Sequence, residues 1–159
     1  MANYPAIEIK QAILEDASKV LPLLTQFFRN EGFDAIVERL PTVLDAMLKD
    51  PGSAIFVASH GLETIGVATV TTTSVGLEFS RYAELEDLYV LPQARHQGVG
   101  QALINSVKQW CCQNQCSVLS VVVTPEDEVN RNLIGYYQKY GFQKSERFTL
   151  FYHFNSSQV

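Results

Sequence analysis

The chain has 159 residues, of which 47% are hydrophobic and 18% are charged, and its formal net charge is −5. This length and composition predict one globular domain, 1–159, with a real core, and they argue against disorder. The acidic balance argues against nucleic acid as a partner, and no apolar run reaches the roughly 18 residues of a membrane span.

The sequence also argues against secretion and against metal binding. The N-terminal MANYPAIEIKQ lacks a charged region followed by an apolar one, so we expect no signal peptide and a cytoplasmic location. The three cysteines, Cys111, Cys112 and Cys116, follow a C-C-x3-C spacing without a CxxC pair, and the histidines are scattered. We therefore expect reduced thiols on and just after one helix, and no metal site.

In the first half of the chain, hydrophobic periodicity predicts two helical regions framed by strands. The expected elements are a strand over 7–13, a helix over 16–30, a helical region over 34–49, and strands over 53–59 and 64–75. Asp16 is the expected N-cap of the first helix, and Pro41 is expected to split the second helical region. His60-Gly61 supplies the turn between the two later strands.

The second half predicts a β-α-β unit followed by a helix and a strand. The expected elements are a strand over 81–91, a helix over 98–114, an apolar strand over 117–123, a helix over 129–140 and an alternating strand over 147–154. The apolar run suits a strand in a parallel pair, and Gly141 is the expected end of the last helix. The order β-α-α-β-β-β-α-β-α-β predicts a mixed α/β sheet.

The stretch VLPQARHQGVGQAL, residues 90–103, places two glycines at the start of a helix. The first amides of a helix lack intrahelical partners, and the helix dipole favours an anion there, most often phosphate. Gly98 and Gly100 would allow close approach, and Arg95 and His96 would add donors. The alternative is a loop whose glycines serve only helix–sheet packing. The phosphate motif GxxxxGK[ST] is absent, and GxGxxG is broken at Leu103.

Two motifs, Arg95-x-x-Gly98-x-Gly100 in this loop and NRNLIGYYQKYGF at residues 130–142, resemble those of one family, the GNAT N-acetyltransferases. Arg95-x-x-Gly98-x-Gly100, between a strand and a helix, resembles the family's acyl-CoA signature, although His96 stands where many members carry glycine. The stretch NRNLIGYYQKYGF, residues 130–142, is similar to the family's N-x-x-A-x-x-[FLY]-Y-x-K-x-G-F, with Leu133 in place of the small residue. The resemblance covers about residues 5–154.

This resemblance implies the GNAT fold, a mixed and mostly antiparallel sheet of six to seven strands with about four helices. The fourth and fifth strands would be parallel and would splay apart. It implies acetyl-CoA as co-substrate and direct attack by a primary amine of a small molecule (polyamine-like, amino acid or aminoglycoside) or of a peptide. It also implies that a homodimer is an expected assembly. The residues implied in binding the co-substrate are Leu88, Tyr89, Val90, Arg95, His96, Gln97, Gly98, Val99, Gly100, Gln101, Asn130 and Tyr137.

The resemblance also assigns catalytic roles. Tyr137 matches a tyrosine that lies near the CoA sulfur, and a phenol of pKa near 10 can protonate a thiolate whose thiol has a pKa near 8.5. Periodicity alone would instead place Tyr137 in the core, as part of a helical stripe. The strand backbone over 88–90 would pair with the pantetheine arm, and the amide of Tyr89 or Val90 would polarise the thioester.

The proton acceptor is expected among the carboxylates of the strand 81–91, and both Glu84 and Glu86 match base positions used within the family. The sequence LEDLYV resembles diamine acetyltransferases, which favours Glu86. Strand alternation puts Glu84 and Glu86 on one face with Leu88 and Val90, and puts Asp87 on the other unless a bulge resets the alternation. A carboxylate without a role in proton transfer is the alternative.

Two alternatives of another class stay open at this stage. A GNAT-fold module could bind acyl-CoA as a sensor or scaffold without catalysis, and a nucleotide-binding regulatory domain follows if the CoA assignment fails. The acidic run Glu126-Asp127-Glu128 has two interpretations as well: it complements the dipole of the following helix, or it attracts a cationic acceptor.

Overall fold

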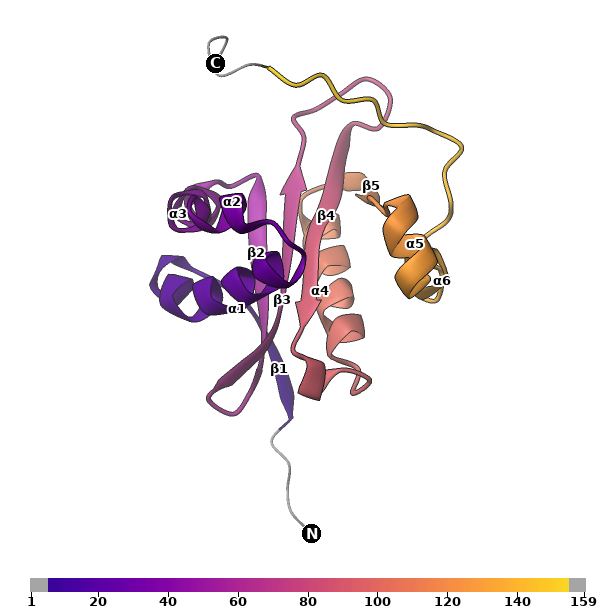
Figure 1. Ribbon diagram of the computed structural model, residues 1–159. Coiled ribbons are helices and arrows are strands. Elements are labelled where there is room, and N and C mark those ends of the chain that lie inside the picture. Colours follow the sequence, from indigo (N-terminus) through magenta and orange to yellow (C-terminus); the bar gives the residue numbers. More distant parts are fainter. Residues whose placement is uncertain (1–5, 155–159) are drawn as a thin grey trace. The chain divides into compact units, whose positions relative to one another are not determined.

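The computed structural model describes residues 6–154, which fall into two compact units, Met1–Val122 and Val123–Val159. The strands are β1 (Ile7–Gln11), β2 (Ser53–His60), β3 (Glu63–Thr72), β4 (Arg81–Val90) and β5 (Cys116–Val121), all in the first unit (Figure 1). The helices of the first unit are η1 (Leu14–Asp16), α1 (Ala17–Asn30), α2 (Asp34–Val37), α3 (Leu40–Lys49), η2 (Pro92–Ala94) and α4 (Val99–Gln113). The second unit holds α5 (Pro125–Arg131) and α6 (Leu133–Gln138).

The sheet of the first unit confirms the predicted mixed topology. Its strand order is β1-β2-β3-β4-β5, with antiparallel pairs up to β4 and a parallel pair between β4 and β5. The β4–β5 pairing runs from Arg81↔Cys116 only as far as Leu85↔Val121, whereas β4 stays paired with β3 as far as Gly66↔Val90. The predicted parallel pair is therefore present, and because β5 ends at Val121, the second half of β4 pairs with β3 alone among the described strands.

The two faces of the sheet are covered by different helices. A Cβ added to Gly66 on β3 would meet the side chains of Val99 and Leu103, so this face of the sheet packs against α4. Tyr89 of β4, the register partner of Val67, points the opposite way, and its ring contacts Phe27 of α1 in a tilted arrangement with ring centroids 5.4 Å apart. The largest fully buried apolar side chains of this core are Val20, Ile55, Val67, Val70, Leu85, Val99, Leu103, Ile104 and Val107.

The helices after β1 follow the sequence closely. Asp16 stands at the N-cap of α1, but its carboxylate accepts the backbone N–H of Ile13 (3.0 Å) and pairs with Lys10 (2.8 Å) instead of capping α1. Pro22 lies inside α1, which continues past it. Pro41 lies in the first turn of α3, where a missing N–H costs little, and it separates α3 from the short α2 as predicted.

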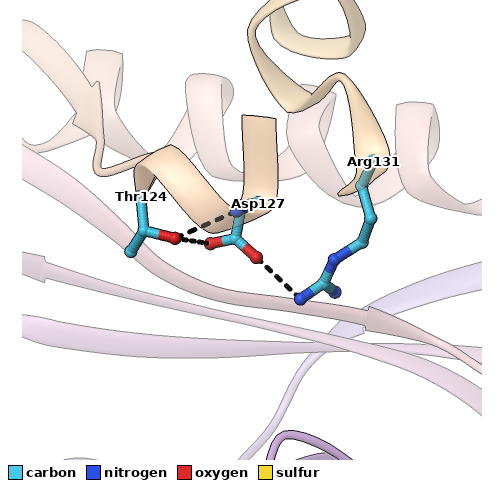
Figure 2. Close-up of polar contacts among 3 residues, drawn as sticks. All are labelled: Thr124, Asp127 and Arg131. Carbon is cyan, nitrogen blue, oxygen red and sulfur yellow. Dashed lines mark hydrogen bonds and ion pairs between the residues drawn. The ribbon is translucent and has the colours of Figure 1, made fainter. Parts of the chain in front are cut away.

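The second unit corrects the prediction of one helix over 129–140. The helix begins earlier, at Pro125, because the Thr124 hydroxyl caps it by accepting the Asp127 N–H at 3.1 Å (Figure 2). It is then broken at Asn132, whose φ of 49° is left-handed, and α6 starts at the next residue. Gly141, with φ 88°, follows the end of α6 as expected of a helix-terminating glycine.

The predicted strand over 147–154 is wrong. The described part of this segment carries no strand, and its alternating side chains are exposed, Phe148 by 93% and Leu150 by 91%. Alternation marks a segment that suits a sheet, but a strand also needs a partner for its backbone groups. Among the described residues of the second unit there is no strand to provide one. Within residues 6–154 the sheet thus has five strands, not six or seven, and there are six α-helices where about four were expected.

Candidate active site

The second half of β4 turns alternate backbone groups away from β3, on the side where β5 has already ended. The Leu91 N–H donates to Ile65 O at 2.9 Å, so Leu91 faces β3. Because antiparallel pairing alternates with period two, Tyr89 faces β3 as well, while the N–H groups of Leu88 and Val90 point the other way. The family resemblance implies that the N–H of Tyr89 or Val90 polarises the thioester. The Val90 N–H points away from β3 and fits this role, whereas the Tyr89 N–H does not. The Leu88 N–H points the same way as that of Val90 and is a further candidate.

Arg95 joins the end of β4 to the loop that follows. Its Nε donates to Val90 O at 3.0 Å, and its guanidinium carbon lies 5.9 Å from the centroid of the Tyr89 ring. Tyr89 is itself buried, and its hydroxyl accepts a hydrogen bond from Asn30 Nδ2 at 3.3 Å. Arg95 therefore acts first as a tie between strand and loop, a role that the sequence did not indicate.

The glycine loop leads into α4, whose first amides have no hydrogen-bond partner within the helix. Gly98 is the N-cap residue with φ 82°, and a Cβ placed there would meet no atom within 4 Å. The first intrahelical bond of α4 runs from Ala102 N to Gly98 O at 3.0 Å. The amides of Val99, Gly100 and Gln101 precede that bond, so the helix leaves them for another acceptor.

Two residues of the loop support its shape. His96 is exposed and has φ 61°, which lies in the left-handed region that glycine prefers. His96 therefore adopts a backbone conformation that a glycine at this position would adopt without strain. Gln97 donates through its side chain to Gln93 O at 2.9 Å, which closes the loop on itself.

A β-bulge corrects the predicted faces of β4. The register passes from Thr69↔Asp87 directly to Val70↔Leu85, so Glu86 has no partner of its own on β3. The extra residue resets the alternation, and Asp87 joins Glu84 and Glu86 on the α1 face. Leu88 lies on the opposite face with Val90. The placement of Asp87 apart from the two glutamates, which the unbroken alternation predicted, is therefore wrong.

Each of these three carboxylates accepts a hydrogen bond from one hydroxyl. The pairs are Asp87 with Thr69 (2.5 Å), Glu86 with Thr71 (2.5 Å) and Glu84 with Tyr82 (3.1 Å). Glu86 is exposed, whereas Asp87 is half-buried.

Burial changes the proton affinity of two of these side chains, Asp87 and Tyr82. Burial raises the pKa of the Asp87 carboxyl, the Thr69 hydroxyl opposes that shift, and the nearby charge of Glu86 adds to it. Burial and the hydrogen bond to Glu84 raise the pKa of Tyr82, so that phenol stays protonated near neutral pH.

Asn130 and Tyr137 belong to the second unit. Asn130 is an exposed residue near the end of α5. Tyr137 on α6 is buried, and its ring makes edge contacts with Tyr136 and Phe142, at centroid distances of 5.2 and 5.4 Å. The ring is thus held by other aromatic side chains of its own unit.

The acidic run at the start of α5 has structural partners. Asp127 accepts from the Thr124 hydroxyl at 2.7 Å and pairs with Arg131 at 2.7 Å, as Figure 2 shows. Glu128 accepts the backbone N–H of Ile134 at 2.8 Å and so links α5 to α6. These contacts favour the structural interpretation of Asp127 and Glu128.

The described residues contain no group of three metal-ligating side chains and no helix long and apolar enough to cross a membrane. The sequence pattern did not place Asp87 beside Glu84 and Glu86. It also did not identify Thr69 and Thr71 as hydrogen-bond partners of these carboxylates. The threonines alternate along β3, which was a usable signal. The bulge had a signal as well, because the adjacent polar residues Glu86 and Asp87 interrupt the alternation of polar and apolar residues in YAELEDLYV.

Comparisons with known proteins bear on the whole arrangement. The chain matches the acetyltransferase (GNAT) family over residues 17–142. It is 28% identical over 144 residues to the uncharacterized N-acetyltransferase YhfO of Bacillus subtilis, covering 89% of this chain and 93% of that protein. It is 31% identical over 77 residues to an aminoglycoside N(6')-acetyltransferase type 1 of Salmonella typhimurium, covering 48% of this chain and 50% of that protein.

A solved structure shows the same fold. The aminoglycoside N-acetyltransferase AAC(6')-Iy in complex with CoA superposes with a TM-score of 0.78 at 22% identity, covering 96% of this chain and 98% of that one. The family match spans most of the chain, including the glycine loop, the carboxylates of β4 and the tyrosines of α6. The chain therefore belongs to the GNAT acetyltransferase family and is an acyltransferase.

Proposed function

We propose that this chain transfers the acetyl group of acetyl-CoA to a primary amine, by direct attack of the amine on the thioester. The observation that carries the proposal is the continuity of two sets of backbone donors. The amides of Leu88 and Val90 face the open side of β4, and the loop from Pro92 leads directly to the free amides of α4. Such a track suits a long ligand with an amide-bearing arm and a phosphate end.

The residues present fit CoA in chemistry as well as in order. At the start of α4, Val99, Gly100 and Gln101 would hold the pyrophosphate through their N–H groups, aided by the helix dipole. The open surroundings of Gly98 leave room for that anion. Along β4, Leu88 and Val90 would bind the pantetheine arm as an added strand. Acetyl-CoA supplies the activated acetyl group when it is bound.

Glu86 is the residue that we propose as proton acceptor, with Glu84 as the second candidate. An amine of pKa near 10.4 is mostly protonated at pH 7, and reaching the neutral form costs roughly 4–5 kcal/mol. Glu86 is exposed on the α1 face, where an acceptor can reach it, and the Thr71 hydroxyl orients its carboxylate. Glu84 is instead held by Tyr82.

Two further roles complete the reaction. The N–H of Val90 or Leu88 would stabilise the charge that develops on the thioester oxygen. As the new N–C bond forms and the C–S bond breaks, Tyr137 would give its phenolic proton to the departing thiolate. The motif around Tyr137 supports this assignment, as does its buried ring, whose contacts fix its orientation.

The acceptor that we propose is an amine-bearing molecule of one of four classes. An aminoglycoside, a polyamine-like cation, an amino acid and a peptide amine all fit a site with carboxylates on one face. The partial match to an aminoglycoside N(6')-acetyltransferase favours testing aminoglycosides first. We further propose a homodimer and a cytoplasmic location, and light scattering in solution tests the first of these.

The deciding experiment measures thiol release from acetyl-CoA against a panel of aminoglycosides, polyamines, diamines, amino acids and peptides. Mass spectrometry of the product should show one added acetyl group per modified amine. A strong hit establishes the enzyme and its acceptor together. Stabilisation of the fold by acetyl-CoA without turnover on any amine would contradict catalysis and support the binding-module alternative.

A further inference from the structure

The pair formed by Thr69 and Asp87 lies where β4 changes its alternation. Thr69 is 1% exposed on β3, and its Oγ1 lies 2.5 Å from Asp87 Oδ2 on β4. The two residues are also register partners, and the next register pair is Val70↔Leu85. This side-chain bond therefore closes the bulge on its C-terminal side, and Glu86 is the residue left over.

Two reacting groups of the proposed mechanism adjoin this bond. Glu86 precedes Asp87, and the amide of Leu88, which points to the open side of β4, follows it. Beyond Leu85, β5 no longer holds the backbone of β4. From β3, the polar groups on this face are Thr69 and Thr71, and Thr71 binds Glu86. From α1, the Asn30 amide is engaged by the Tyr89 hydroxyl instead.

We infer that the Thr69–Asp87 hydrogen bond, called here the brace, is a positioning element of the acetyl-transfer site. It fixes the bulge, and through the bulge it sets the position of the Glu86 carboxylate and of the Leu88 amide. The inference rests on the proposed function for its catalytic consequence. Its structural part, that the brace holds the bulge, does not.

The physical reason is preorganisation. A donor aimed at a developing oxyanion contributes because it needs no rearrangement during the reaction, and a displacement of about 1 Å can lower a rate about 100-fold. Beyond Leu85, β5 no longer pairs with β4. The Thr69–Asp87 hydrogen bond to β3 therefore contributes to fixing the backbone of β4 there.

The test compares variants that keep the hydrogen bond with variants that remove it. Thr69→Ser keeps the hydroxyl, and Asp87→Asn keeps an oxygen that accepts it, whereas Thr69→Val and Asp87→Ala break the brace. With the best acceptor of the panel, we expect the breaking variants to lower kcat by about 10- to 100-fold, with the KM for acetyl-CoA within about twofold. The two keeping variants should stay within about threefold of the wild-type kcat.

Thr72→Val is the matched control. Thr72 lies on the same strand, and its hydroxyl also makes a bond to another segment, to O of Gly52 just before β2, at 3.0 Å. Its loss should lower the unfolding temperature without lowering kcat. If Thr72→Val lowered kcat as much as Thr69→Val, the effect of Thr69 would be one of general stability, and the inference would be wrong. A loss of kcat in Asp87→Asn as large as in Asp87→Ala would also overturn it, since charge and not the hydrogen bond would then matter.

A second measurement keeps the inference separate from the proposed function. In 15N-labelled full-length protein, the amide signal of Leu88 should shift in Thr69→Val and Asp87→Ala, but stay in place in Thr69→Ser and Thr72→Val. If no amine is acetylated by the wild type, the proposed function fails, and this measurement still decides whether the brace holds the bulge. An unchanged Leu88 signal in both breaking variants would overturn the inference.

Discussion

Gly66 of β3 and Val99 of α4 are in such close contact that even a methyl group on Gly66 would require its neighbours to move by a few tenths of an ångström. A Cβ added to Gly66 would lie 3.1 Å from Val99 Cγ1, 3.2 Å from Leu103 Cδ1 and 3.2 Å from Tyr89 O. Val99 is the first residue of α4, so this contact sets where the free amides of the helix lie relative to β4. The absence of a side chain at one residue of β3 thus positions the proposed phosphate site.

Gly66→Ala should therefore weaken both the fold and the binding of acetyl-CoA. Crowding against two side chains and a backbone oxygen should cost about 1–3 kcal/mol of unfolding free energy. The displaced helix start should raise the KM for acetyl-CoA. Gly76→Ala is the control, because its added Cβ would meet only Ser80 O at 3.8 Å, an ordinary contact. Denaturant unfolding and steady-state kinetics check both effects, and equal stability of the two variants would contradict the packing argument.

Gly98→Ala should have two effects that can be measured separately, a loss of stability through backbone strain and a loss of CoA affinity. The open surroundings of Gly98 mean that the methyl group itself fits, but φ 82° disfavours any L-residue, at a cost of about 1 kcal/mol. We also expect weaker CoA binding, measured by calorimetry, because the methyl group fills space beside the helix amides. Gly61→Ala shares the positive φ, at 63°, in the β2–β3 turn and should lose stability alone. Unchanged CoA affinity in Gly98→Ala would remove Gly98 from the proposed phosphate site.

Tyr137→Phe should lower kcat while the KM for acetyl-CoA stays within about twofold. The substitution keeps the ring that packs on Tyr136 and Phe142 and removes only the proposed proton donor. A positioned acid contributes typically about 100-fold or more, so the loss should be of that order. Tyr136→Phe is the matched control on the same helix, and we expect it to leave turnover unchanged. Wild-type turnover of Tyr137→Phe at saturating acetyl-CoA would remove Tyr137 from the mechanism.

The sequence predicted the scaffold better than the details of the site. Periodicity and turn residues located the strands and the helix that carry the glycine loop, because local patterning reflects burial on a sheet or helix. The adjacent polar residues Glu86 and Asp87 interrupt the alternation of β4, but which residue is bulged depends on the partner strand and could not be predicted. The break at Asn132 likewise depends on contacts such as that of Glu128 with Ile134 N–H. The alternating 147–154 shows the limit of local pattern, because pairing requires a neighbour.

The three cysteines should differ sharply in reactivity. Cys112 is exposed, while Cys111 is buried, and burial raises the pKa of the Cys111 thiol to about 12. Burial also raises the pKa of Cys116. Because the thiolate is the reactive form, native protein at pH 8 should show one fast-reacting thiol towards a disulfide reagent. Cys112→Ser should abolish that fast phase and so remove the background from a thiol-release assay. A fast phase that survives in Cys112→Ser would contradict this order.

Asp16 should make the fold sensitive to acid. The Ile13 N–H and the Lys10 ammonium hold the pKa of the Asp16 carboxyl below 3.8 in the folded chain. Because the folded pKa is lowered, this stabilisation is present above the unfolded value of about 4 and is lost as the pH falls through the folded value. Asp16→Asn should cost about 1 kcal/mol of unfolding free energy at pH 7, and the difference from wild type should shrink towards pH 3. Asp45→Asn, which removes only an exposed pair with Lys49, should change stability by less than about 0.5 kcal/mol. Urea unfolding at both pH values measures these differences, and a cost of Asp16→Asn that did not shrink in acid would show that the carboxylate charge is not its source.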